Sequence, residues 1–127
     1  MGTGMITDSE KTILRTLIFF DVFDHPLTPF EIWKYAYDIG KQHACSLSTL
    51  FHELRTSSFI AERTEKHDGV YTLAGRGALV GLRRERTVYA DQKYAIAQKI
   101  TRVFARFPFV RMVCVCNTVG FGTAKKE

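Results

Sequence analysis

The sequence predicts an α+β fold in which helices predominate. Three observations lead to this class. Three short stretches with helical apolar spacing come before a β-hairpin signal. One uninterrupted helical pattern then runs over 77–107, and a short apolar run leads into two glycines near residue 127.

The first helix is expected over 9–24. Apolar side chains recur there every three or four residues, as on the buried face of a helix. Asp8 or Ser9 is suited to cap its start. Pro26 ends it, because the residue before a proline avoids helical dihedral angles.

The second helix has a sharper start signal. Thr28 and Glu31 have the spacing of a capping box, with Pro29 at the first helical position. We expect this helix to run to about Ile39 and to stop at Gly40. Its aromatic residues offer a stacking platform for bases or a share of the core, and the core is the favoured interpretation for Trp33, Tyr35, Tyr37 and Phe30.

The third helix is expected over about 48–57, and the apolar period then changes. Residues 59–63 indicate a strand, residues 66–69 a tight turn and residues 70–73 a returning strand. The Asp-Gly pair in the turn is typical of a β-hairpin. Three helices followed by a hairpin is the order of a winged helix, which we predict as a domain over 1–75.

A long connecting helix is expected next, within the segment 76–107, and Pro108 ends it. Its length of about 45 Å suits a strut between two bodies. The run at 109–116 indicates a strand that is mostly apolar on both faces, as in the centre of a covered sheet. We therefore expect 108–127 to begin an incomplete domain. Self-association through the long helix or the terminal strand is a further expectation.

Charge is concentrated in one part of the chain. Residues 76–111 hold nine Lys or Arg against two acids, a net +7, whereas residues 1–75 carry −3 and the whole chain +5. Two interpretations stay open: the basic helix contacts nucleic acid, or its cations pair with acids of another domain. The candidate nucleic-acid-binding residues are Arg83, Arg84, Arg86, Lys93, Lys99, Arg102 and Arg106.

The three cysteines give no disulfide framework. Cys114 and Cys116 have a C-x-C spacing that suits a soft metal, but small buried hydrophobic side chains are the favoured interpretation. The N-terminus has no signal-peptide pattern, and the apolar runs are too short to span a membrane. A cytoplasmic location and no membrane partner follow.

Two stretches resemble a family of bacterial proteins that carry a helical N-terminal domain ahead of a nucleotidyltransferase domain of the polymerase-β type. They are FFDVFDHPLTPFEIWKY at 19–35 and the strand and glycine turn at 110–124. The resemblance implies that the turn contacts nucleotide phosphates. Asn117 and Thr118 stand where the family has Gly-Ser, and Gly122 matches a later small residue. The acidic pair that holds Mg²⁺ in the family would follow this chain, so no catalytic, metal or cofactor site is expected within it.

The resulting hypothesis is the N-terminal portion of a nucleotidyltransferase, inactive alone, whose parent transfers a nucleotidyl group from a nucleoside triphosphate with Mg²⁺. The alternative is a winged-helix transcriptional regulator that binds DNA as a dimer through the long helix. A protein-interaction adaptor is a third hypothesis. For the regulator, the polar side chains of the third helix would face DNA: Thr49, His52, Arg55, Thr56, Ser57 and Ser58.

Overall fold

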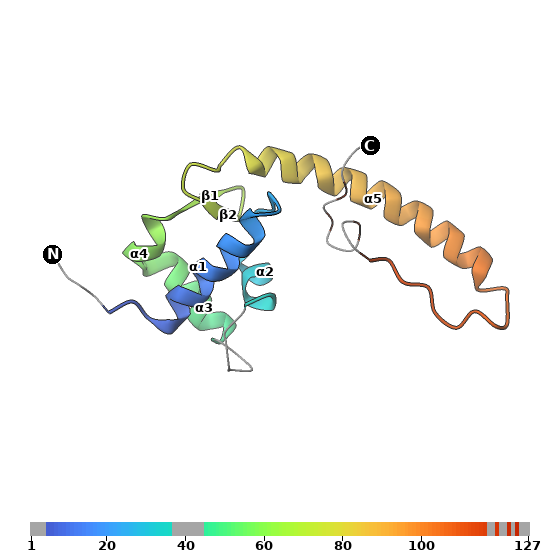
Figure 1. The fold of residues 1–127 in the computed structure, drawn as a ribbon, viewed down its shortest axis with the longest axis horizontal. Coiled ribbons are helices and arrows are strands. Elements are labelled where there is room, and N and C mark those ends of the chain that lie inside the picture. The colour runs from blue at the N-terminus through green and yellow to red at the C-terminus, as the bar shows by residue number, and fades with distance from the viewer. Residues whose placement is uncertain (1–4, 37–44, 117–118, 120–121, 123, 125–127) are drawn as a thin grey trace. The chain divides into compact units, whose positions relative to one another are not determined.

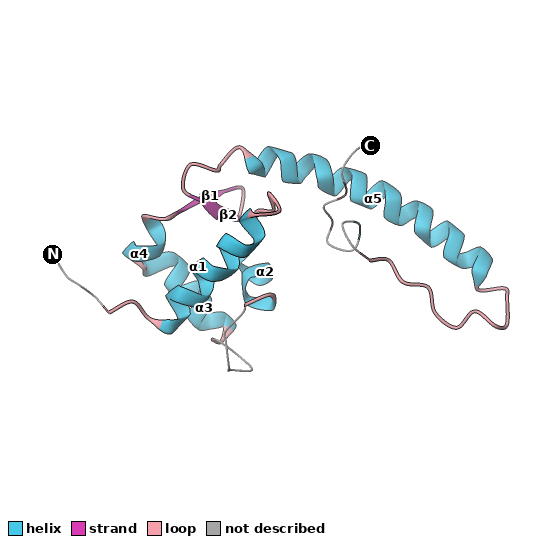
Figure 2. Ribbon diagram, viewed as in Figure 1, coloured by secondary structure: helices cyan, strands magenta, loops and turns pink. Residues whose placement is uncertain are grey.

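The computed structural model describes residues 5–36, 45–116, 119, 122 and 124. Along the chain (Figure 1) the elements are α1 (Asp8–Asp21), α2 (Pro29–Lys34), α3 (Leu47–Thr56), α4 (Ser58–Ala61), β1 (Thr64–His67), β2 (Val70–Leu73) and α5 (Leu79–Phe104). Helices make up most of the described chain, beside one antiparallel pair of strands (Figure 2). The predicted α+β class with a helical majority is confirmed. The chain divides into two compact units, Met1–Val80 and Gly81–Glu127.

Helix α1 begins slightly earlier than predicted because Thr7 caps it. The Thr7 hydroxyl accepts a hydrogen bond from the Glu10 backbone N–H at 3.1 Å, and the Glu10 carboxylate accepts one from the Thr7 N–H at 2.8 Å. This reciprocal pair is a capping box, and it replaces the cap by Asp8 or Ser9 that the sequence analysis predicted. The helix ends at Asp21 instead of residue 24, and Asp24 adopts a positive φ of 52°.

Leu27, between α1 and α2, joins the hairpin. Its N–H donates to the Tyr71 carbonyl at 3.1 Å, and the Tyr71 N–H donates to the Leu27 carbonyl at 2.7 Å. Strand β2 also pairs with β1 in antiparallel register. Tyr71 therefore has partners on both edges of β2, and the chain segment before α2 is fixed against the strands.

The predicted capping box of α2 is confirmed. The Glu31 N–H donates to the Thr28 hydroxyl at 3.3 Å, and the Thr28 N–H donates to the Glu31 carboxylate at 2.8 Å. The helix ends at Lys34 with Tyr35 as its C-cap, so the expectation that it runs to about Ile39 is wrong. The expected stop at Gly40 lies outside the described residues.

One hydrophobic core holds the first unit together. Helices α1 to α4 and strand β2 contribute to it, as does Leu27, and burial of these side chains supplies the main driving force for folding. The core cluster contains Ile13, Leu17, Leu27, Ile32, Leu50, Ile60 and Tyr71. Phe30 and Trp33 are 54% and 37% exposed, so the expectation that these two aromatic residues fill the core is wrong.

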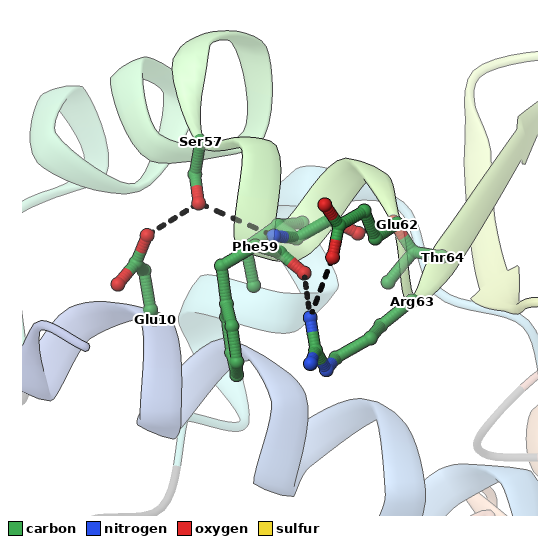
Figure 3. Close-up of polar contacts among 7 residues, drawn as sticks. Glu10, Ser57, Phe59, Glu62, Arg63 and Thr64 are labelled. Atoms are coloured by element: carbon green, nitrogen blue, oxygen red, sulfur yellow. Dashed lines mark hydrogen bonds and ion pairs between the residues drawn. The ribbon is translucent and has the colours of Figure 1, made fainter. Parts of the chain in front are cut away.

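The predicted strand at 59–63 is also wrong, because most of it forms α4. Ser57 ends α3 and caps α4, since its hydroxyl accepts a hydrogen bond from the Ile60 N–H at 3.2 Å. The same hydroxyl donates to the Glu10 carboxylate of α1. Figure 3 shows Ser57 pointing at Glu10 beside this short helix. The cap outweighs the β propensity of Phe59 and Ile60.

The hairpin turn is confirmed. Asp68 and Gly69 have φ angles of 50° and 79°, as a two-residue turn with two left-handed positions requires. The register pairs His67 with Val70 next to the turn and Thr64 with Leu73 at the far end.

Helix α5 is shorter than the predicted 77–107 at both ends. The chain tightens where the helix ends, because the Arg106 N–H donates to the Val103 carbonyl at 3.2 Å and the Phe107 N–H to the Phe104 carbonyl at 3.0 Å. This three-residue spacing is that of a 3₁₀ turn. The predicted strand at 109–116 is wrong, because the structure describes these residues as a loop. A strand needs a second strand for its backbone groups, and the described residues around this apolar run provide none.

Candidate functional site

The candidate nucleotide turn is only partly described. Asn117 and Thr118 lie outside the described residues. Gly122 has a positive φ of 67°, which favours glycine, and its N–H donates to the Val119 carbonyl at 3.1 Å. Its own carbonyl lies 3.5 Å from the Thr87 hydroxyl of α5. The phosphate-binding role of this turn stays a prediction.

The seven candidate cations do not form a single stripe. At about 100° per residue, helical geometry places one group on one side of α5 and a second group nearly opposite. The first group is Lys99 and Arg102, followed by Arg106 just past the helix end at Phe104; the second is Arg83, Arg86 and Lys93. Arg84 shares the side of Lys99 and Arg102 but lies about 22 Å from Lys99 along the axis. Arg86 is only 7% exposed, whereas the residues of the first group are exposed.

An open hollow of about 530 Å³ lies beside the first group. Its helical wall has ring, amide, hydroxyl and guanidinium groups, and two valines of the loop form the other wall. The lining residues are Tyr94, Ala97, Gln98, Thr101, Arg102, Val113 and Val115. Of these residues the sequence analysis named only Arg102 as a binding candidate, because the second wall depends on the loop folding back along α5.

A second polar surface is the outward face of α3. Leu50 is fully buried on the inner face, and the opposite side has exposed hydroxyl, imidazole and guanidinium groups. A shallow hollow of about 610 Å³ is lined by Ser48, Phe51, His52, Arg55 and Thr56. These five residues contain no carboxylate. Ser57, which was expected to face DNA, is instead engaged by Glu10 and Ile60.

Several acids of the first unit have structural roles away from α3. Hydrogen bonds from the Ser57 hydroxyl and then the Thr7 N–H lower the pKa of Glu10. The pKa of Glu65 is lowered chiefly by the Gly75 N–H, which donates to it at 2.7 Å.

Arg76 clamps the end of α1. Its guanidinium donates to Asp21 at 3.0 Å and to Asp24 at 2.7 Å, and Asp21 is the first cause of its raised pKa. This cation, which sequence reasoning counted with the basic segment, therefore pairs with acids of the first unit.

Exposed apolar side chains lie on α1, in the turn after it and on α2, and together they are called the exposed apolar face. The Phe19 and Phe23 rings lie 5.6 Å apart, and the Phe30 and Trp33 rings 5.7 Å apart. The exposed residues of this face are Ile18, Phe19, Val22, Phe23, Phe30 and Trp33. Most of them belong to the stretch 19–35 that carries the family resemblance.

Cys114 and Cys116 are exposed, so the expectation that both are buried hydrophobic side chains is wrong. Within the described ranges, no three His, Cys, Asp or Glu side chains are grouped to hold a metal ion. No helix in these ranges combines the length and apolarity of a membrane span. Comparison with protein-family models, curated proteins and solved structures found no match for this chain.

Proposed function

We propose that this chain is the N-terminal winged-helix portion of a nucleotidyltransferase of the polymerase-β type. The observation that carries the proposal is the pairing of Leu27 with Tyr71. The first unit therefore has the order α1, bridge residue Leu27, α2, α3, the short helix α4 and the hairpin, with Leu27 on the outer edge of β2. This order supports a winged helix, the domain type that the resemblance of residues 19–35 implies ahead of the transferase domain.

The exposed apolar face supports the same proposal. Exposed apolar side chains that contact one another, as in the two aromatic pairs of this set, occur at protein–protein contacts in folded proteins. Phe19 and Phe23 in α1 and the following turn, and Phe30 and Trp33 on α2, lie in the resembling stretch yet outside the core. We propose that this face docks the winged helix onto another part of the parent protein.

In the parent, Mg²⁺ held by an acidic pair would neutralise the phosphate charge that develops during nucleotidyl transfer. This chain would contribute backbone groups near Asn117 and the Thr118 hydroxyl on the phosphate side of the site, with Gly122 allowing the turn.

The proposal is tested by incubating the full-length gene product with α-³²P-labelled nucleoside triphosphates and candidate acceptors, first RNA and then protein. We expect label to enter an acceptor with Mg²⁺ and not with EDTA. Substitution Thr118→Ala should lower the rate. Absence of label from every acceptor fraction of a complete cell extract would contradict the proposal.

A second candidate, DNA binding by a winged-helix regulator that dimerises through α5, is favoured by the outward face of α3. Winged helices place this helix in the major groove. His52 and Arg55 lie one turn apart there, and both are exposed.

This candidate is tested by fluorescence anisotropy with duplex DNA at several salt concentrations. Arg55→Ala removes one phosphate or base contact and should weaken binding about tenfold, because a good base contact contributes about 1–3 kcal/mol. The matched control is Arg15→Ala, an exposed arginine on α1. Equal affinities of the two variants would exclude α3 as the contact surface.

A further inference from the structure

We propose that the hollow beside the C-terminal half of α5 binds single-stranded nucleic acid. In this site the cations Lys99, Arg102 and Arg106 hold successive phosphates, and the Tyr94 ring stacks on one base. The inference does not depend on the nucleotidyltransferase proposal, because it needs no nucleotide or metal site.

The charge of this part of the chain is unbalanced. Residues 92–116 contain five Lys or Arg and no Asp or Glu. Neutralisation of phosphates by such cations releases counterions and is the main source of affinity for nucleic acids. A face with no carboxylate over this length therefore fits a polyanion.

The cations are arranged to follow a strand. Lys99 and Arg102 lie on α5 within an arc of about 60° and about 4.5 Å apart along its axis, and Arg106 follows two residues after the helix ends at Phe104. All three side chains are exposed. Arg102 also lines the hollow, so one phosphate-binding cation lies at the site proposed for the base.

The hollow has the chemistry of a base site. Tyr94, Gln98 and Arg102 are spaced four residues apart and lie on one side of α5. Tyr94 is 50% exposed, so a ring face is accessible to a base, and Gln98 offers an amide to a base edge. Val113 and Val115 supply an apolar opposite wall. A volume of about 530 Å³ is in the range of small-ligand sites.

These features favour a single strand over a duplex. Stacking on an aromatic ring requires a base that is not already stacked within a helix, and single strands supply such bases without sequence preference. An acidic protein would satisfy the cations but would gain nothing from Tyr94 and Gln98. Binding of an acidic polypeptide in place of a single strand is therefore the alternative that the test must distinguish.

The test is fluorescence anisotropy of a labelled twelve-nucleotide oligouridylate with the full chain, over a series of salt concentrations. We expect salt-dependent binding that is tighter than binding of an equally long duplex. Lys99→Ala combined with Arg102→Ala should lower the logarithmic salt slope by about 1.4, since each single-strand phosphate contact contributes about 0.7. Tyr94→Ala should weaken binding about 5- to 100-fold with an unchanged slope.

The matched control is Lys11→Ala combined with Arg15→Ala, which removes the same charge from exposed positions on α1. It should leave affinity and slope unchanged, and circular dichroism should show equal helix content for all variants. Equal losses in the two double variants would overturn the site. Duplex binding as tight as single-strand binding, or tight binding of polyglutamate alone, would also overturn it.

Discussion

Replacement of Ser57 by alanine should destabilise the first unit, because its hydroxyl makes two hydrogen bonds. The substitution removes the cap of α4, which contributes about 1 kcal/mol. It also removes the hydrogen bond to the Glu10 carboxylate, and such bonds to charged groups contribute about 1.5 kcal/mol. The expected loss is therefore about 2.5 kcal/mol. For a unit of 80 residues this lowers Tm by about 15 °C.

The assay is thermal unfolding of the full chain at pH 7, followed by circular dichroism. Ser58→Ala is the matched control, because Ser58 is the exposed neighbour and loses the same hydroxyl. It should change stability by less than about 0.5 kcal/mol. Ser57→Thr should keep most of the stability, since it keeps the hydroxyl. Equal shifts for the two alanine variants would refute the reasoning.

The effect of Ser57→Ala should also depend on pH. The pKa of Glu10 is lowered in the folded chain, first by the Ser57 hydrogen bond. Its stabilising effect is therefore present above the unfolded pKa of about 4.3 and is lost as pH falls through the lowered folded pKa. The difference in Tm between wild type and variant should shrink from pH 7 to pH 3. If the Tm difference stays constant from pH 7 to pH 3, the loss of stability comes from the α4 cap alone and not from the hydrogen bond to Glu10.

The remaining predictions concern the core, the clamp and the thiols. Leu50→Ala should cost about 2–5 kcal/mol, measured by urea unfolding, because Leu50 is fully buried; a loss below 1 kcal/mol would place it outside the core. Arg76→Ala should cause only a small loss of stability, since its side chain is 42% exposed, and the loss should fall in 1 M salt; a salt-independent loss would argue against ion pairing. Cys114 and Cys116 should react with a disulfide reagent faster than Cys45, whose pKa is raised by burial; three equal rates would contradict the described exposures.

Local signals in the sequence predicted the first unit well. The capping box of Thr28 and Glu31 and the Asp68-Gly69 turn were readable because their hydrogen bonds and dihedral angles involve close neighbours in the sequence. The helix at 58–61 was missed because the β propensity of Phe59 and Ile60 favoured a strand over the local cap by Ser57. The contact of Ser57 with Glu10 of α1 spans 47 residues and leaves no local pattern.

The candidate sites were less predictable. The acid-free basic stretch is visible in the sequence, but the separation of its cations onto two sides of α5 appears only when the helical positions are compared. The pattern at 109–116 has the β propensity of a strand, yet propensity alone cannot supply a second strand. The positions of Val113 and Val115 beside α5 were therefore not predictable.

Equilibrium binding of Mg²⁺-nucleoside triphosphates by the full-length gene product tests the central claim most directly, because it does not require the acceptor. The account predicts saturable binding of at least one of the four triphosphates that is lost with EDTA and weakened by Thr118→Ala. A folded protein that binds none of the four with Mg²⁺ present would contradict it.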